Sequence, residues 1–348
     1  MKIIIYLLTV IIFIILNCCK SDSTFETTSE KESPGSNNKF EQFASGILFE
    51  NQTLHVRIAD NSPRYNSILD NSIEGMNGIA VLIHKDQQKN IFNTVGMNLE
   101  MTETQPPYGK YKDTWNAPRV APMHMEQIDS LTVKLVQDAE EASGLNYEIY
   151  FKLGAYFIDQ TITFWPNIDL TYADAFFASY MNSVQNTSLF LRRPKDSNKP
   201  GEWLEVASAG HGGDGEIYAR LIDPFGKEWH EFHSDNPLLR QAIQHSQETK
   251  KATLEAGFSV YKERKPDHFW FGFVDDYVLI MIFKEPVFGM WMSASGGRAV
   301  RCPAWDYTFR SGPQKADEKR SYHVRAVYKK FAGIEDILDE VDRFVKED

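Results

Sequence analysis

The chain has 348 residues, of which 42% are hydrophobic and 24% are charged, a composition typical of a globular protein and not of a disordered or fibrous one. Its 48 acidic residues outnumber the 37 basic ones and give a net charge of -11, which argues against a nucleic-acid partner because such proteins present a basic face to the phosphates. The cysteines Cys18, Cys19 and Cys302 are too few and too badly placed for a disulfide scaffold or a cysteine-ligated zinc site.

Residues 1–19 predict a signal peptide. An unbroken apolar run from Ile3 to Leu16 has the length of a signal-peptide core and is short for a membrane span, which needs about 20 residues. The run ends at Cys18 and Cys19 and resembles the signal of bacterial lipoproteins, in which a cysteine receives lipid at its thiol. We expect the lipid on Cys19, with Cys18 as the alternative; an ordinary secretory signal that ends in cysteine is the other interpretation.

Residues 20–39 are rich in Ser, Thr and Glu and nearly free of apolar residues, so they predict a flexible tether. No linker or low-complexity stretch interrupts residues 40–348, for which we expect a single domain. The protein is therefore expected outside the cytoplasm, lipid-anchored to a bacterial membrane, on the periplasmic side of the outer membrane or at the cell surface.

Most of the body alternates apolar and polar residues, the pattern of half-buried strands. The apolar run Tyr277–Phe283 predicts a central strand buried on both faces. The alternating segments are 53–58, 131–136, 147–153, 160–165 and 322–328.

Two helices are predicted. Pro237 follows Asp235 and Asn236, where a first helical residue would stand, and an apolar stripe from Ile334 to Val345 predicts a C-terminal helix that caps a sheet edge. The sequence thus predicts an all-β fold, a large antiparallel β-sandwich with a few short helices including a C-terminal one.

Several segments, in this order, resemble a family of secreted proteins from bacteria that digest complex polysaccharides. They are 77–82, 96–100, 117–119, 177–182, 293–297 and 303–307. The resemblance spans roughly residues 50–345 and implies the supersandwich fold of galactose mutarotases and of sugar-binding domains in glycoside hydrolases and polysaccharide lyases. It supplies no catalytic residues and does not fix a reaction, because one fold hosts many chemistries.

A glycine-rich stretch, 210–215, holds the first catalytic candidates, His211 and Asp214. A histidine exchanges protons near neutral pH, Asp214 is able to orient or charge it, and the glycines leave room for a ligand. The alternative is a hairpin loop with an exposed His211.

His230 and His233 lie shortly after this loop. Together with His211 they are candidate ligands of a divalent metal, but their spacing matches no established metal motif. We favour a strand end that runs into the helix at Pro237, and no cofactor is predicted.

The other catalytic candidates are two carboxylates, Glu100 and Asp306, because sugar hydrolysis and mutarotation each need an acid and a base. The alternative is that both are turn or sheet-edge acids. Asp275 and Asp276 are adjacent and would point to opposite faces of a strand, so they are not expected to share one cleft.

Sugar rings stack their apolar faces on indoles, while Asn, Arg and His bind their hydroxyls. Arg119 is also a candidate clamp for a carboxylate such as that of a uronic acid. The alternatives are core packing for the tryptophans, a surface position for Arg119 and a turn for Asn182. The substrate-binding candidates are Asn77, Asn98, Arg119, Asn182, Trp203, Trp229, His230, His233 and Trp305.

These observations predict an exported, lipid-anchored protein that acts on oligo- or polysaccharide. We expect an enzyme (a glycoside hydrolase, polysaccharide lyase or sugar epimerase) that uses histidine acid–base chemistry. The alternative is a non-catalytic glycan-binding surface lipoprotein. No complete triad, nucleophile elbow or phosphate loop selects one reaction.

Overall fold

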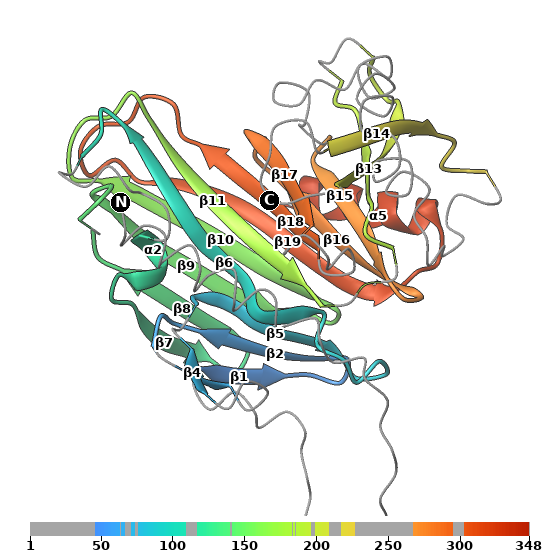
Figure 1. Ribbon diagram of the computed structural model, residues 1–348, viewed down its shortest axis with the longest axis horizontal. Helices are drawn as coiled ribbons and strands as arrows, with labels where there is room; N and C mark the ends of the chain where they lie inside the picture. The colour runs from blue at the N-terminus through green and yellow to red at the C-terminus, as the bar shows by residue number, and fades with distance from the viewer. Residues whose placement is uncertain are drawn as a thin grey trace, which may run out of the picture.

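The computed structural model describes residues 46–62, 64–66, 71–73, 76–108, 117–139, 141–182, 184, 186–195, 199–208, 217–226, 267–294 and 303–347. Their strands form two large antiparallel sheets of seven and ten strands, which lie face to face, and one two-stranded sheet (Figure 1). The predicted all-β antiparallel sandwich is confirmed. The signal peptide, the tether and the helix expected at Pro237 lie outside the described residues.

The seven-stranded sheet has the order β1-β2-β5-β6-β11-β18-β17. Its strands are β1 (Ile47–Glu50), β2 (Leu54–Ala59), β5 (Gly78–His84), β6 (Phe92–Gln105), β11 (Tyr172–Met181), β18 (Pro303–Arg310) and β17 (Gly289–Ala294). The two-stranded sheet pairs β3 (Arg64–Asn66) with β4 (Asn71–Ile73).

The ten-stranded sheet has the order β14-β13-β12-β15-β16-β19-β10-β9-β8-β7. Its strands are β7 (His124–Asp129), β8 (Thr132–Gln137), β9 (Leu145–Leu153), β10 (Phe157–Pro166), β12 (Leu189–Arg192), β13 (Trp203–Ser208), β14 (Ile217–Ile222), β15 (Phe269–Val274), β16 (Tyr277–Phe283) and β19 (Arg320–Lys330). The five alternating segments of the sequence lie in β2, β8, β9, β10 and β19, and the apolar run is β16, so these predictions are confirmed.

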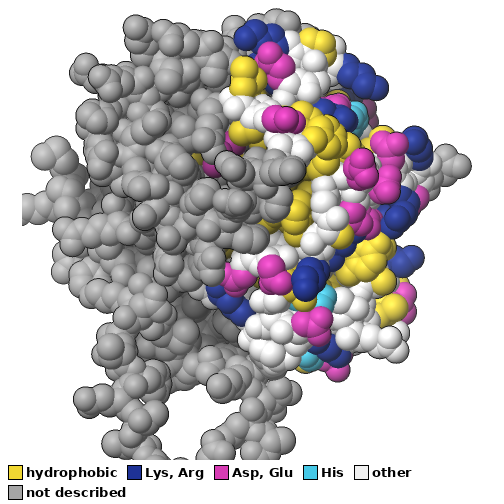
Figure 2. Space-filling view, turned by 90° about the vertical axis from the view of Figure 1, so that its right-hand side faces the viewer, with side chains coloured by type: hydrophobic (Ala, Val, Ile, Leu, Met, Phe, Trp, Pro, Cys, Tyr) yellow, Lys and Arg dark blue, Asp and Glu magenta, His cyan; other side chains and the backbone are white. Residues whose placement is uncertain are grey.

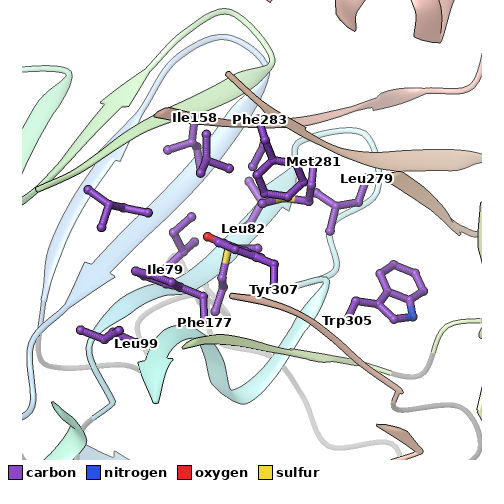
Figure 3. Packing of buried hydrophobic residues seen from close by; sticks show 14 of the residues in the cluster. Ile79, Leu82, Leu99, Ile158, Phe177, Leu279, Met281, Phe283, Trp305 and Tyr307 are labelled. Carbon is purple, nitrogen blue, oxygen red and sulfur yellow. The ribbon is translucent and has the colours of Figure 1, made fainter. Parts of the chain in front are cut away.

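The core lies between the two large sheets and receives alternate residues from both. Leu99 and Phe177 reach it from the seven-stranded sheet, and Ile158 and Phe283 reach it from the ten-stranded sheet (Figure 3). The ring of Tyr307 stacks on Phe177 and meets Phe283 edge to face, with ring centroids 5.2 Å apart in both pairs. Each fully buried side chain of this size stabilises the fold by about 1.5–3 kcal/mol.

The helix α5 (Ile334–Lys346) covers the outer face of the ten-stranded sheet. Its residues Ile337, Val341 and Phe344 form a second apolar cluster with outward side chains of β12, β15 and β16. This helix explains why β16 is buried on both faces. The expectation that the helix caps a sheet edge is wrong, because these strands lie in the interior of the sheet.

The side of the molecule that lies to the right in Figure 1 carries interspersed acidic and basic side chains over its described part (Figure 2). Such mixing differs from the basic stripe by which proteins bind nucleic acid. No helix in the described ranges is both long and apolar enough to cross a membrane.

Candidate functional site

The outer face of the seven-stranded sheet carries a cluster of polar residues from three neighbouring strands. Leu99, Phe177 and Tyr307 point into the core, so the alternation of each strand turns Asn98 of β6 and Asp306 of β18 to the opposite side. Asn98 is 1% exposed and Asp306 is 6% exposed. A polar outer face that is also buried distinguishes this region from an ordinary solvated sheet surface.

Glu100 stands at a β-bulge in β6 and, like Asn98, lies on the face opposite Leu99. Phe176 pairs with Met101 and Phe177 pairs with Leu99, so Glu100 is the extra residue without a partner of its own on β11. Bulges are frequent next to active sites. Glu100 reaches the polar cluster, where Tyr180 donates a hydrogen bond of 3.1 Å to its Oε2 atom.

Arg119 joins this cluster from the short helix α2 (Ala117–Val120). Its Nη2 atom lies 2.7 Å from Oε2 of Glu100, and its Nε donates a hydrogen bond of 2.7 Å to Oδ1 of Asn98. The guanidinium carbon also lies 5.7 Å from the centre of the Tyr180 ring. Arg119 is buried, so this charge-assisted pair forms away from bulk water, where such bonds are stronger.

Three amide side chains hold α2 in place through one backbone oxygen. The carbonyl of Pro118 accepts hydrogen bonds from Asn61 (2.7 Å), Gln137 (3.0 Å) and Asn77 (3.3 Å). Asn77 also exchanges hydrogen bonds with the backbone N–H and C=O of Leu99, at 2.8 and 3.0 Å. The position of α2 is therefore fixed from the loop after β2, from β8 and from the residue that precedes β5.

Asp306 is the acid of this cluster that most resembles a proton donor. Burial raises its pKa well above the usual range, and the nearby charge of Glu100 raises it further. The backbone N–H of Ser179, which donates a 2.8 Å hydrogen bond to Oδ1, and the charge of Arg119 oppose this shift without cancelling it. Asp306 thus keeps its proton to a higher pH than an exposed aspartate does.

The arrangement combines an acid whose pKa is raised, Asp306, with a carboxylate that is paired with an arginine, Glu100. Burial, and then the charge of Glu100, also raise the pKa of Tyr180, whose hydroxyl therefore remains a donor to Glu100. Two carboxyl groups in environments of opposite character are the usual basis of acid–base catalysis. Among the described residues, no group of three or more His, Cys, Asp or Glu side chains is placed to hold a metal ion.

The structure brings four of the predicted site residues together: Glu100, Asp306, Asn98 and Arg119. Asn77 supports them through backbone hydrogen bonds and does not point to a free ligand position. Arg119 is not the surface residue of the alternative interpretation. It binds Glu100 of the chain itself, which argues against its predicted use as a clamp for a substrate carboxylate.

The prediction that Trp305 and Trp203 stack on sugar rings is wrong. Trp305 is fully buried between the sheets, where its ring meets that of Trp270 edge to face, and its Nε1 donates to the Thr187 carbonyl at 3.3 Å. Trp203 is 8% exposed and belongs to the apolar cluster under α5, close to Phe269. Neither indole is available to a sugar ring.

Asn182 follows the end of β11 and binds two backbone carbonyls of the chain. Its backbone N–H donates to the carbonyl of Ile91 at 2.8 Å, and its side-chain amide donates to the carbonyl of Asn90 at 3.1 Å. Asp275 and Asp276 form the turn between β15 and β16, with Asp275 at a φ of 58°. The remaining candidates lie outside the described residues; they are His211, Asp214, Trp229, His230 and His233, with the lipidation candidates Cys18 and Cys19.

Sequence reasoning missed Tyr180, Asn61 and Gln137. The signal for Tyr180 was present in the sequence. Tyr180 lies three residues after the core residue Phe177 on β11, and this odd spacing places it on the opposite face of the strand. The roles of Asn61 and Gln137 depend on contacts with Pro118, 57 and 19 residues away, which no local pattern reveals.

No family model matches this chain, and no curated protein matches it in sequence. Solved structures to which it is similar include a galactose mutarotase-like protein from Lactobacillus casei, with a TM-score of 0.46, 9% identity, and coverage of 82% of this chain and 100% of the other. The Slr1438 protein of Synechocystis has a TM-score of 0.46 and 8% identity, over 88% of this chain and 100% of that protein.

A 4-alpha-glucanotransferase from Thermococcus litoralis is similar over 82% of this chain and 37% of its own, with a TM-score of 0.34 and 9% identity. At these scores and identities the likenesses carry no statement about what this chain binds or does.

Proposed function

We propose that this chain is a carbohydrate-active enzyme whose reaction centre is the polar cluster on the outer face of the seven-stranded sheet. Asp306 is the general acid and Glu100 is the carboxylate that accepts a proton. The observation that supports this proposal is the raised pKa of Asp306 beside a carboxylate paired with Arg119. The sugar as substrate rests on the family resemblance of the sequence.

The chemistry needs few further groups. A protonated Asp306 donates its proton to a glycosidic or ring oxygen, while Glu100 takes a proton from a hydroxyl group or from an attacking water. Arg119, Asn98 and Asn77 are positioning residues, because they hold Glu100 and the strand that carries it. His211 stays a predicted additional acid–base group.

The test is turnover by the mature protein on a panel of plant and algal glycans, read as new reducing ends, unsaturated products or exchange of anomers. The variants Asp306→Asn and Glu100→Gln are isosteric, and the amide oxygen introduced by Asp306→Asn is still able to accept the Ser179 hydrogen bond. We expect each variant to lower the rate by about 10²–10⁴-fold, the usual worth of a general acid or base.

Asp267→Asn is the matched control, because Asp267 is also a buried acid paired with an arginine, Arg192, but it precedes β15 of the other sheet. It should leave turnover close to that of the wild type. Wild-type rates in both Asp306→Asn and Glu100→Gln would overturn the proposal. Binding without turnover in the wild type would favour the alternative of a non-catalytic glycan-binding protein.

We further propose that the protein is exported and anchored by lipid, which rests on the sequence of residues 1–19. Metabolic labelling of bacteria with a radioactive fatty acid should label the wild type and Cys302→Ser but not Cys19→Ser. If labelling is lost in Cys18→Ser instead, the lipid is on Cys18. If the wild type is not labelled, the protein carries no lipid anchor.

A further inference from the structure

The outer side of β18 continues beyond Asp306. Tyr307 and Phe309 point into the core, so Asp306, Thr308 and Arg310 follow one another on the outer face. At about 3.3 Å per residue, Arg310 lies about 13 Å along the strand from Asp306. This separation exceeds the reach of a single sugar ring and corresponds to a short chain of them.

Asp306, Thr308 and Arg310 form a line on the outer face of β18. At the Arg310 end of this line lies an aromatic cluster. The guanidinium carbon of Arg310 lies 3.6 Å from the centre of the Phe288 ring and 4.3 Å from that of Tyr172, so it stacks against both. Both carboxylate oxygens of Asp174 bind Arg310, the Nε to Oδ1 distance being 2.6 Å. Tyr172 in turn donates a 3.2 Å hydrogen bond to Glu103.

Phe288 nevertheless remains 42% exposed. A single exposed apolar residue needs no explanation by itself. Here, however, the guanidinium covers one side of the ring and fixes it, so the exposed surface is chiefly the remaining face and edge. A fixed aromatic ring that is open on one side is the surface on which the apolar face of a sugar stacks.

Thr308 lies between the acid and this aromatic cluster. It is 4% exposed, and its Oγ1 has no hydrogen-bond partner within the part of the chain that the structure describes. An unpaired buried hydroxyl costs about 1–3 kcal/mol. Its partner across the ladder on β17 is Gly289, which has no side chain to supply the missing bond.

The charges along the line favour a neutral ligand. Arg119 and Arg310 each already bind a carboxylate of the chain, so neither is free to bind a carboxylate of a ligand. The charged side chains are Arg119 and Arg310 against Glu100, Glu103 and Asp174, two positive charges against three negative ones. The remaining negative charge would repel a uronate.

We propose that Phe288, Arg310 and Tyr172 form a second sugar subsite, and that the ligand is a neutral oligosaccharide that extends along β18 from Asp306. This inference rests on the proposed function, since it takes Asp306 as the reaction centre. Phe288 binds a distant sugar unit and takes no part in the reaction.

The experiment measures affinity and turnover of the mature protein for size-fractionated oligosaccharides of one to six units, prepared from starch, cellulose, xylan and mannan. The affinity of the wild type should rise with the number of sugar units up to about three and then stay constant. In Phe288→Ala this rise should be lost, with about tenfold weaker binding of the longer oligosaccharides and unchanged binding of single units. Phe225→Ala is the matched control, because Phe225 is 64% exposed but follows β14 in the other sheet.

The outcomes separate the two proposals. If Asp306→Asn abolishes turnover while Phe288→Ala keeps the wild-type dependence on chain length, the second subsite is wrong and the reaction centre stands. Tighter binding of uronate oligosaccharides than of neutral ones of the same length would also overturn the inference. If the wild type turns over another glycan of the panel but binds none of these neutral fractions, the second subsite is wrong and the reaction centre stands.

Discussion

The two large sheets differ in what they carry on their outer faces. The outer face of the ten-stranded sheet is apolar over β12, β15 and β16, and α5 covers it with apolar residues of its own. The outer face of the seven-stranded sheet is polar over β6, β11 and β18. The first face stabilises the fold by burial, whereas the second buries groups that cost free energy to remove from water.

One acid on each side shows the difference most clearly. Glu340 of α5 is 2% exposed and Asp306 is 6% exposed. Burial alone would raise both pKa values. For Glu340, however, hydrogen bonds from Lys329 and Tyr156, both at 2.7 Å, with the charges of Lys329 and Arg343, lower the pKa below its usual range.

Asp306 accepts a hydrogen bond from the backbone N–H of Ser179 and has the charge of Glu100 beside it, so its pKa rises. Burial is the largest cause of the raised pKa of Asp306, whereas at Glu340 the neighbouring donors and charges outweigh burial, so these neighbours decide which of the two buried acids is a fixed anion. A fixed anion attaches a helix, and a proton donor is suited to chemistry.

The largest expected effect separates the two acids by activity. Asp306→Asn should lower turnover by about a hundredfold or more, because it removes the proton donor. Glu340→Gln should leave turnover per folded molecule unchanged, because Glu340 contacts only α5 and the ten-stranded sheet. Rates measured on the active glycan, normalised to the folded fraction, decide this; an equal loss in both variants would contradict the comparison.

The second effect is on the free energy of unfolding, where Glu340 is expected to matter more than Asp306. Glu340→Gln leaves Lys329 without one of its two carboxylate partners and should lower the free energy of unfolding by about 3 kcal/mol. Asp342→Asn is the control, since the Asp342–Lys346 pair is exposed and should be worth at most about 0.5 kcal/mol. Urea denaturation measures both, and equal effects would show that the buried network does not hold the helix.

A smaller effect appears in the pH dependence of stability. The lowered pKa of Glu340 stabilises the fold above the pKa of an unfolded glutamate, about 4.3, and this contribution is lost as the pH falls through the folded value. The raised pKa of Asp306 acts in reverse. Its contribution is complete below the pKa of an unfolded aspartate, about 3.9, and is lost as the pH rises through the folded value.

Unfolding measured from pH 3 to pH 8 should therefore show opposite trends (a range chosen to bracket the ordinary carboxyl values). Asp306→Asn should gain stability relative to the wild type as the pH rises, whereas Glu340→Gln should lose it. Parallel curves for the two variants would show that the pKa values of Asp306 and Glu340 are not shifted in opposite directions.

The smallest effect concerns the side chain that holds Glu100. Arg119→Lys keeps the charge but loses the planar fork that binds Glu100 and Asn98 together. We expect a moderate loss of turnover, about tenfold, with the optimum pH shifted and the fold retained. A pH profile that only scales down without shifting would indicate that Arg119 does not act through Glu100.

Local periodicity predicted the strands β2, β8, β9, β10, β16 and β19 and the C-terminal helix, because each of these depends on residues close in the sequence. The position of α5 was not predictable, since an apolar stripe shows that a helix packs but not on which surface. The bulge at Glu100 depends on the register between β6 and β11, which the sequence of one strand does not reveal. The buried position of Trp305 was predictable from the sequence, because alternation along the strand places it on the face opposite Asp306.

The proposed reaction depends on a proton held by Asp306. The most direct measurement is an NMR titration of the carboxyl carbon of Asp306 in protein labelled at aspartate, assigned by its loss in Asp306→Asn. We predict a midpoint clearly above the ordinary value of about 3.9, and a lower midpoint in Glu100→Gln, which lacks the neighbouring charge. A midpoint at or below the ordinary value, unchanged in Glu100→Gln, would contradict the proposed role of Asp306.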